Sequence, residues 1–133
     1  GVTTNINEKA KYTANTGIVV ISTANANIDG TGTIGTIITA ASNGTLVKNL
    51  TIQARTNTAR GMVRIYLYNP FSGTPYNLID EIDIPAVIQS GTQACFSITY
   101  ELDYYLNAGL SLAASTEIAN TFVVTAEGLD FTY

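Results

Sequence analysis

The chain has 133 residues, of which only 12% are charged, and a formal net charge of −4. This length fits one domain that can bury a sufficient core without a disulfide or a metal. The negative balance argues against a dedicated nucleic-acid binder, which would carry a basic face. No apolar run reaches the ~18 residues of a membrane-spanning helix, so no membrane partner is expected.

The composition and the turn signals predict an all-β chain. Thr, Ile and Val supply 20, 15 and 8 residues beside eight Tyr, and these residue types suit half-buried strands. Eight or nine strands are expected, near residues 17–22, 33–40, 45–55, 61–68, 77–84, 94–102, 110–115 and 121–127, with a last short one at 129–132. Short strands separated by turns indicate an antiparallel, jelly-roll-like β-sandwich. Residues 1–16 are polar and weakly patterned and are predicted to be a loose arm, with one domain over 17–133.

Two stretches make more specific predictions. In "IITAASNGTLVKNLTI", two patterned runs meet at Asn43-Gly44, a pair preferred in tight reversals, so a hairpin is predicted there. In "MVRIYLY", large residues occupy both faces, so this strand is expected to be covered on both sides.

The charges are unevenly distributed along the sequence. Residues 1–64 carry six basic residues and two acids, a net +4, whereas residues 65–133 carry eight acids and no base, a net −8. The simpler interpretation is that the two halves interleave in one sandwich and neutralise each other. The alternative is a polarised molecule that docks head to tail or onto a charged scaffold.

Two loop motifs resemble ligand sites only in part. Residues 30–35, "GTGTIG", match the dinucleotide-binding pattern, but a β-branched run follows instead of the helix that the motif needs. Residues 25–30, "NANIDG", resemble half of a calcium loop. The twelfth position of that loop is Thr36 rather than a carboxylate, so no metal site is expected.

The parts of most catalytic sites are missing from the sequence. Without any His, neither a Ser–His or Cys–His pair nor an imidazole metal site can form. Cys95 is the single cysteine, so no internal disulfide is possible. We therefore expect no cofactor and no enzyme activity.

Three acids in "LIDEIDIPA", Asp80, Glu81 and Asp83, are the remaining candidates for chemistry. Carboxylates that catalyse glycoside hydrolysis must face each other across the substrate, whereas acids that alternate along one strand do not. The pattern instead predicts that Glu81 and Asp83 face water, while Leu78, Ile82 and Ile84 face the core.

The stretch "IYLYNPFSGTPYNLIDEIDIPA" (65–86) resembles small all-β virion proteins of tailed bacteriophages. Their aromatic strand, turn and "Y-x-L-[IW]-D-E-I" strand match residues 65–68 and 76–86 here, and "YYLNAGLSLAAST" (104–116) is similar to another of their segments. Two departures are the longer loop 69–75 and Asn107, where these proteins have a proline. The resemblance implies a jelly-roll-like sandwich and a capsid decoration (cement) protein on the virion surface. It also implies the major capsid protein and further copies of this chain as partners, with a homotrimer expected.

Two function classes remain after these exclusions. For a decoration protein, the candidate capsid or subunit contacts are Lys9, Lys11 and Tyr12 in the arm, and the pair Tyr104 and Tyr105, of which one must face outward. The alternative is a carbohydrate- or receptor-binding module of a tail fibre or adhesin, with Phe71 and Tyr76 as the candidate ligand residues.

Overall fold

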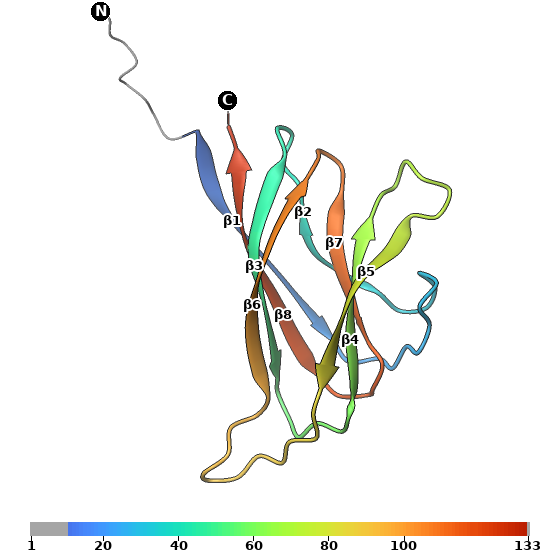
Figure 1. The fold of residues 1–133 in the computed structure, drawn as a ribbon, viewed down its shortest axis with the longest axis vertical. Helices are drawn as coiled ribbons and strands as arrows, with labels where there is room; N and C mark the ends of the chain where they lie inside the picture. The colour runs from blue at the N-terminus through green and yellow to red at the C-terminus, as the bar shows by residue number, and fades with distance from the viewer. Residues whose placement is uncertain (1–10, 133) are drawn as a thin grey trace, which may run out of the picture.

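The computed structural model describes residues 11–132, which form eight strands in two packed antiparallel sheets (Figure 1). The predicted all-β sandwich is confirmed. The strands are β1 (Tyr12–Ile21), β2 (Gly35–Thr39), β3 (Thr45–Ala54), β4 (Gly61–Tyr68), β5 (Tyr76–Ile84), β6 (Ser97–Leu106), β7 (Ser111–Thr116) and β8 (Phe122–Phe131).

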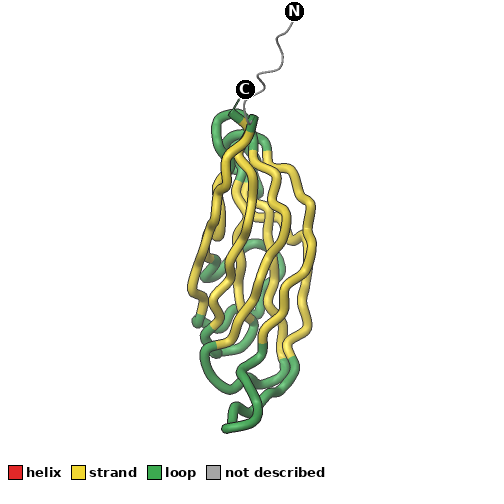
Figure 2. Tube along the Cα trace, turned by 90° about the vertical axis from the view of Figure 1, so that its left-hand side faces the viewer, coloured by secondary structure: helices red, strands yellow, loops and turns green. Residues whose placement is uncertain are grey.

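The strand order is that of a jelly roll. One sheet runs β1-β8-β3-β6 and the other β2-β7-β4-β5, so the chain crosses between sheets at every connection except β4 to β5. This order arises when four hairpin-like strand pairs fold over into two sheets. Turned by 90°, the molecule is elongated, with the strands running along its length and loops gathered at both ends (Figure 2).

Alternating side chains build the core between the sheets. In β3, Leu50 and Ile52 are fully buried, whereas Thr51 and Gln53 point to the outer face. This alternation arises because a pleated strand sends successive side chains to opposite faces. Facing residues of the other sheet, such as Val63, complete the apolar interior.

Strand β4 is covered on both faces, as predicted. Its inner face contributes Val63 and Ile65 to the core, while Arg64 and Tyr66 on the outer face are also buried. The outer cover includes the loop over residues 22–34. The Tyr66 hydroxyl donates to the backbone oxygen of Asn27 at 3.0 Å. The motif at residues 25–30 lies in this loop, and the motif at residues 30–35 runs from it to the first residue of β2.

The predicted boundaries of the arm and of the last strand are wrong. β1 begins at Tyr12 and pairs with β8 along its whole length, from Tyr12 opposite Phe131 to Ile21 opposite Phe122. Residues 12–16 are therefore strand and not arm, because β8 offers them a partner that their own weak pattern does not reveal. The short strand expected at 129–132 is the end of β8 rather than a ninth strand.

The predicted hairpin at Asn43-Gly44 is also wrong. Gly44 does make the reversal, with a φ of 92°, but β2 and β3 belong to different sheets. β2 pairs with β7, and β3 lies between β6 and β8. A turn fixes the change of direction, whereas the partner of each strand is decided by long-range packing.

A β-bulge changes the faces of β5. Ile65 pairs with Asp80 and Tyr66 with Leu78, so Ile79 is an extra residue opposite β4. An inserted residue shifts the alternation of the strand. Leu78 thus lies on the outer face with Tyr66, and Ile79 packs against the core in its place. The expectation that Leu78 joins Ile82 and Ile84 in the core is wrong for Leu78 alone.

The two oppositely charged halves of the chain interleave, as the simpler interpretation predicted. Each sheet combines strands from both halves. Among residues 11–132, the ion pairs join bases of the first half to acids of the second: Lys48 to Asp103, and Arg64 to both Glu81 and Glu117.

Candidate functional site

Aromatic and aliphatic side chains gather on the outer face of the β1-β8-β3-β6 sheet, at the end where β1 begins and β8 ends. Strand pairing places them side by side: Tyr12 lies opposite Phe131, and Leu46 lies opposite both Leu129 and Tyr105. We call this set the terminal patch. It consists of Tyr12, Leu46, Tyr105, Leu129 and Phe131, contributed by four strands.

The patch remains partly open to solvent. Tyr12 and Tyr105 are 50% and 47% exposed, and Leu46, Leu129 and Phe131 are half-buried. None of its five side chains is charged. A cluster of this composition differs from single exposed apolar residues, which are common on any protein surface.

Tyr105 is held in the patch by a ring contact and a hydrogen bond. Its ring lies 5.8 Å from that of Phe131, centroid to centroid, and its hydroxyl donates to the backbone oxygen of Asn43 at 3.4 Å. The hydroxyl also lies against Gly44, where a Cβ would overlap it. The Asn43-Gly44 turn therefore shapes one side of the patch.

The structure brings together predicted contact residues that are far apart in the sequence. Tyr12 and Tyr105 belong to one patch, and exposed Lys11 adjoins it, since the Lys11 backbone oxygen accepts from the Thr132 amide. Tyr104 points the other way, opposite Val47 and against the core. Lys9 lies outside the described residues.

Leu46, Leu129 and Phe131 were missed as candidate contacts. The sequence "GLDFTY" (128–133) does place Leu129 and Phe131 on one face of a strand. Their proximity to Tyr105 depends on β3, which lies between β8 and β6. No local pattern predicts that neighbourhood.

Next to the patch, the same outer face carries a shallow groove of about 350 Å³, lined by Ala14, Thr16, Lys48, Asn49, Glu127, Gly128 and Leu129. Further along β1, Ile18 and Val20 are 61% and 50% exposed on this face. Lys48 sits at a bulge in β3 and pairs loosely with Asp103 at 3.5 Å. Further along the sheet, Thr51 and Thr99 share a hydrogen bond of 2.8 Å.

The two residues predicted for ligand binding lie apart. Phe71 is 80% exposed and adjoins Gly109, where a Cβ would touch its ring. Tyr76 instead packs its ring against Tyr68, with centroids 4.7 Å apart, and lines a different groove with residues 29–31 and 73–75. Phe71 lies within the long loop 69–75 and Tyr76 directly follows it, but the two residues do not form one site.

The acids of β5 do not form a facing pair. Glu81 binds Arg64, Asp83 lies on the same outer face, and Asp80 lies on the inner face opposite Ile65. Glu81 and Asp83 are exposed on the outer face, as predicted, and Glu81 is in addition the partner of a buried cation. Within residues 11–132, no three His, Cys, Asp or Glu side chains are grouped to hold a metal ion. The same residues contain no helix long and apolar enough to cross a membrane.

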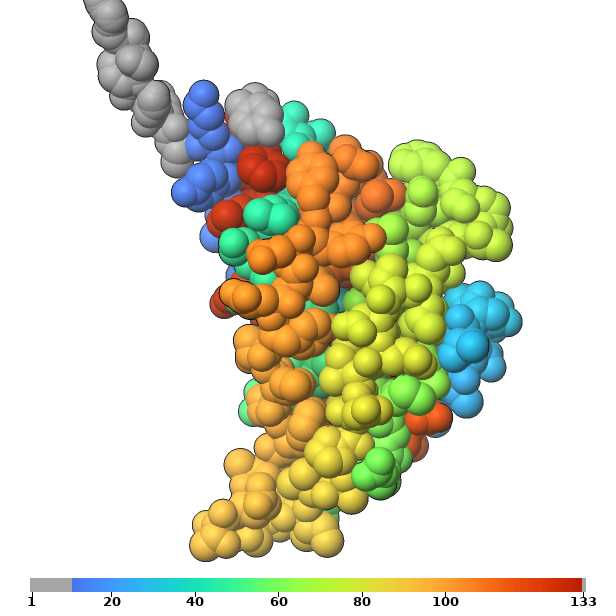
Figure 3. All heavy atoms as spheres, viewed as in Figure 1, coloured from blue at the N-terminus to red at the C-terminus, as the bar shows by residue number. Residues whose placement is uncertain are grey.

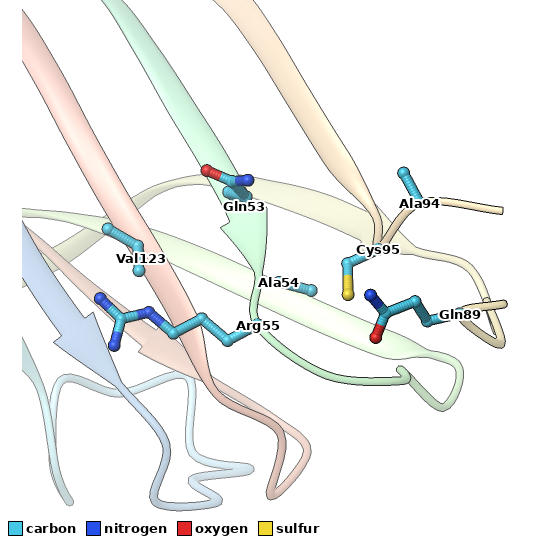
Figure 4. A pocket seen from close by; sticks show the side chains of 7 residues that line it. All are labelled: Gln53, Ala54, Arg55, Gln89, Ala94, Cys95 and Val123. Atoms are coloured by element: carbon cyan, nitrogen blue, oxygen red, sulfur yellow. The ribbon is translucent and has the colours of Figure 1, made fainter. Parts of the chain in front are cut away.

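An open pocket of about 580 Å³ surrounds Cys95 where β3 ends and β6 begins. Figure 4 shows the thiol pointing toward Gln89, while the guanidinium of Arg55 extends the other way, toward Val123. No imidazole stands nearby to activate the half-buried thiol, since the chain has no His. Because the thiol and the guanidinium point in different directions, the side chains that line this pocket do not converge on one point.

Comparisons with known proteins were made at the level of sequence and of fold. No protein-family model and no curated protein matches the sequence. The fold is similar to a chain in a solved structure, the cyanophage Pam1 capsid asymmetric unit, at 15% identity and a TM-score of 0.44, over 92% of this chain and 85% of that chain. An identity this low does not assign a function to this chain.

Proposed function

We propose that the chain is a structural virion protein that decorates and stabilises a phage head lattice. The terminal patch is the observation that carries this proposal. It offers a partner an uncharged aromatic surface on a rigid sheet, and protein interfaces are enriched in aromatic residues and depleted of charge at their centres. The jelly-roll strand order and the sequence resemblance of residues 65–86 support the same function.

The proposed partners are the major capsid protein and further copies of this chain, with a homotrimer as the expected assembly. Tyr12 and Tyr105 are the proposed anchors, because large, partly exposed aromatics dominate the binding energy of many interfaces. Lys11, which is exposed and directly precedes Tyr12, is the cation proposed to meet an acidic group of the partner.

The copy number in the particle tests the location. Quantitative mass spectrometry of purified virions should find the chain in a number that matches the head lattice. A few copies per particle would instead support the alternative, a carbohydrate- or receptor-binding module of a tail fibre or adhesin.

Light scattering of the free protein should show a trimer, and a monomer at high concentration would contradict the homotrimer.

Binding to heads that lack this chain tests the patch. The double variant Tyr12→Ala/Tyr105→Ala should weaken binding about 30-fold or more, since two anchors together contribute about 2 kcal/mol or more. Ile88→Ala is the control, because Ile88 is 72% exposed and belongs to the connection between β5 and β6, which lies at the opposite end of the sandwich (Figure 1). Equal binding of the wild-type and double-variant proteins would rule out the patch as the contact.

A further inference from the structure

A second surface feature lies on the other sheet, between the loop 22–34 and the loop 69–75. These two loops are neighbours on the right-hand side of the space-filling view (Figure 3). The groove between them measures about 400 Å³ and is lined by Asp29, Gly30, Thr31, Gly73, Thr74, Pro75 and Tyr76. It is separate from the terminal patch.

One wall of the groove carries a fixed carboxylate. Asp29 Oδ1 accepts hydrogen bonds from the Thr31 hydroxyl at 2.6 Å and from the Thr31 amide at 3.1 Å. Thr31 Oγ1 in turn accepts from Asn27 Nδ2 at 3.0 Å, and the Asn27 backbone oxygen is held by Tyr66. This chain of bonds ties Asp29 to the sheet and leaves Oδ2 without a hydrogen bond from the described residues.

Asn25 fixes the loop 22–34 through further hydrogen bonds. It is 5% exposed, and its Nδ2 donates to the backbone oxygens of Thr31 and Thr33, each at 3.0 Å. A loop fixed in this way needs little ordering when a ligand binds, which favours affinity.

The opposite wall contains one aromatic residue, Tyr76. The Tyr76 ring packs against Tyr68 and meets the Tyr66 ring edge-on, with centroids 6.4 Å apart. Gly30 approaches its backbone so closely that a Cβ would overlap the Tyr76 backbone oxygen, and Gly30 has a φ of 88°. The two walls are therefore held at a fixed separation.

The lining selects a ligand by charge. The hydrogen bonds from Thr31 lower the pKa of Asp29 below its usual value, so the carboxylate is ionised at neutral pH. No Lys or Arg lines the groove. An anionic ligand would be repelled, whereas a ligand rich in hydroxyl donors can satisfy Oδ2.

We propose that this groove binds a neutral saccharide, with hydroxyl groups donating to Asp29 and the C–H face of the sugar resting against Tyr76. Few other neutral ligands combine several hydroxyl donors with an apolar ring face. The Thr74 side chain supplies a further polar group to the lining. The site does not depend on the position of the chain in a particle, so it goes beyond the proposed structural function.

Calcium is a weaker candidate for the same groove. Asp29 is the single charged side chain among the lining residues, and calcium sites in proteins use six to eight oxygens with several carboxylates. The Thr31 hydrogen bonds also occupy one of the two Asp29 oxygens. The structure thus favours a ligand that donates hydrogen bonds over a cation that several oxygen atoms must coordinate.

Amide NMR titrations of the whole chain test the site. The probes are the methyl glycosides of glucose, galactose and mannose and N-acetylglucosamine, with N-acetylneuraminic acid as the anionic probe. At least one neutral probe should shift the amides of Gly30, Thr31 and Thr74 saturably, in the millimolar range. The anionic probe should leave them unchanged.

Variants then assign the contacts. Asp29→Asn should weaken binding about tenfold, which corresponds to one charge-assisted hydrogen bond, and should leave the melting temperature nearly unchanged because Asp29 is exposed. Asp83→Asn removes an exposed acid from β5, and Phe71→Ala removes an aromatic of the loop 69–75 that does not line the groove; both should bind as the wild type does. Absence of shifts with every neutral probe, equal binding of the anionic probe, or undiminished binding by Asp29→Asn would each overturn the proposal.

Discussion

Arg64 on β4 and Glu81 on β5 lie opposite each other in the sheet, and the guanidinium Nε donates to the carboxylate at 2.9 Å. Arg64 is only 4% exposed, whereas Glu81 is 41% exposed. Arg64 also reaches Glu117 at 3.8 Å and the backbone oxygen of Asn25 at 3.4 Å. A buried cation thus joins two strands and the loop 22–34.

Glu81→Ala should lower the free energy of unfolding by about 1–2 kcal/mol, because it leaves a buried charge with weaker partners. Glu117 and Asn25 remain, so the loss should stay below that of an isolated buried pair. Asp83→Ala is the matched control on the same face and should change stability by less than about 0.5 kcal/mol. Urea unfolding of both variants measures the difference, and equal midpoints would show that Glu81 is an ordinary surface acid.

Gly44→Ala should destabilise the protein by about 1–3 kcal/mol. Its φ of 92° is unfavourable for a residue with a Cβ, and that Cβ would overlap the Tyr105 hydroxyl. Gly73→Ala is the control, since nothing lies within 4 Å of its added Cβ. Thermal unfolding compares the two variants. If both melt like the wild type, the close contact between Tyr105 and the turn is not important in solution.

Tyr100→Phe should leave stability unchanged at neutral pH or raise it by about 1 kcal/mol. The Tyr100 hydroxyl is buried and has no hydrogen-bond partner among residues 11–132, and an unsatisfied buried polar group is unfavourable. A clear loss of stability would indicate that the hydroxyl has a partner.

The same residue predicts a pH dependence. Burial, and secondly the Asp80 carboxylate, raise the pKa of Tyr100 above its ordinary value. Because the unfolded chain ionises first as pH rises, wild-type stability should be full below the ordinary tyrosine pKa, near 10, and should fall above it. The fall should be smaller in Tyr100→Phe. Urea midpoints across the alkaline range measure it, with Tyr12→Phe as the exposed control; equal falls in all three proteins would contradict the assignment.

Asn25→Ala should destabilise the protein by about 2–3 kcal/mol, because two backbone oxygens of the loop 22–34 lose their donor. Thr23→Ala, at an exposed position of the same loop, should have little effect.

Calcium should not raise the melting temperature of either variant or of the wild type. A calcium-dependent rise would restore the interpretation of residues 25–30 as a metal loop.

Several features follow from the sequence alone, because they depend on local pattern. The positions of the strands are predicted to within a few residues for β2 to β5, where alternating side chains and turn residues mark both ends. The burial of both faces of β4 follows from the large residues on each of them. The outward orientation of one member of the pair Tyr104 and Tyr105 follows from strand geometry.

Other features depend on pairing between distant strands, and only the tertiary structure decided them. The Asn43-Gly44 turn joins two sheets rather than two paired strands, and the bulge at Ile79 moves Leu78 away from the core. Residues 12–16 are strand because β8 pairs with them. Likewise, Tyr12 and Tyr105 share a surface only because β8 and β3 lie between β1 and β6. Local pattern sets which residues can be strand and which face is apolar, whereas partner choice is a long-range competition for hydrogen bonds and buried area.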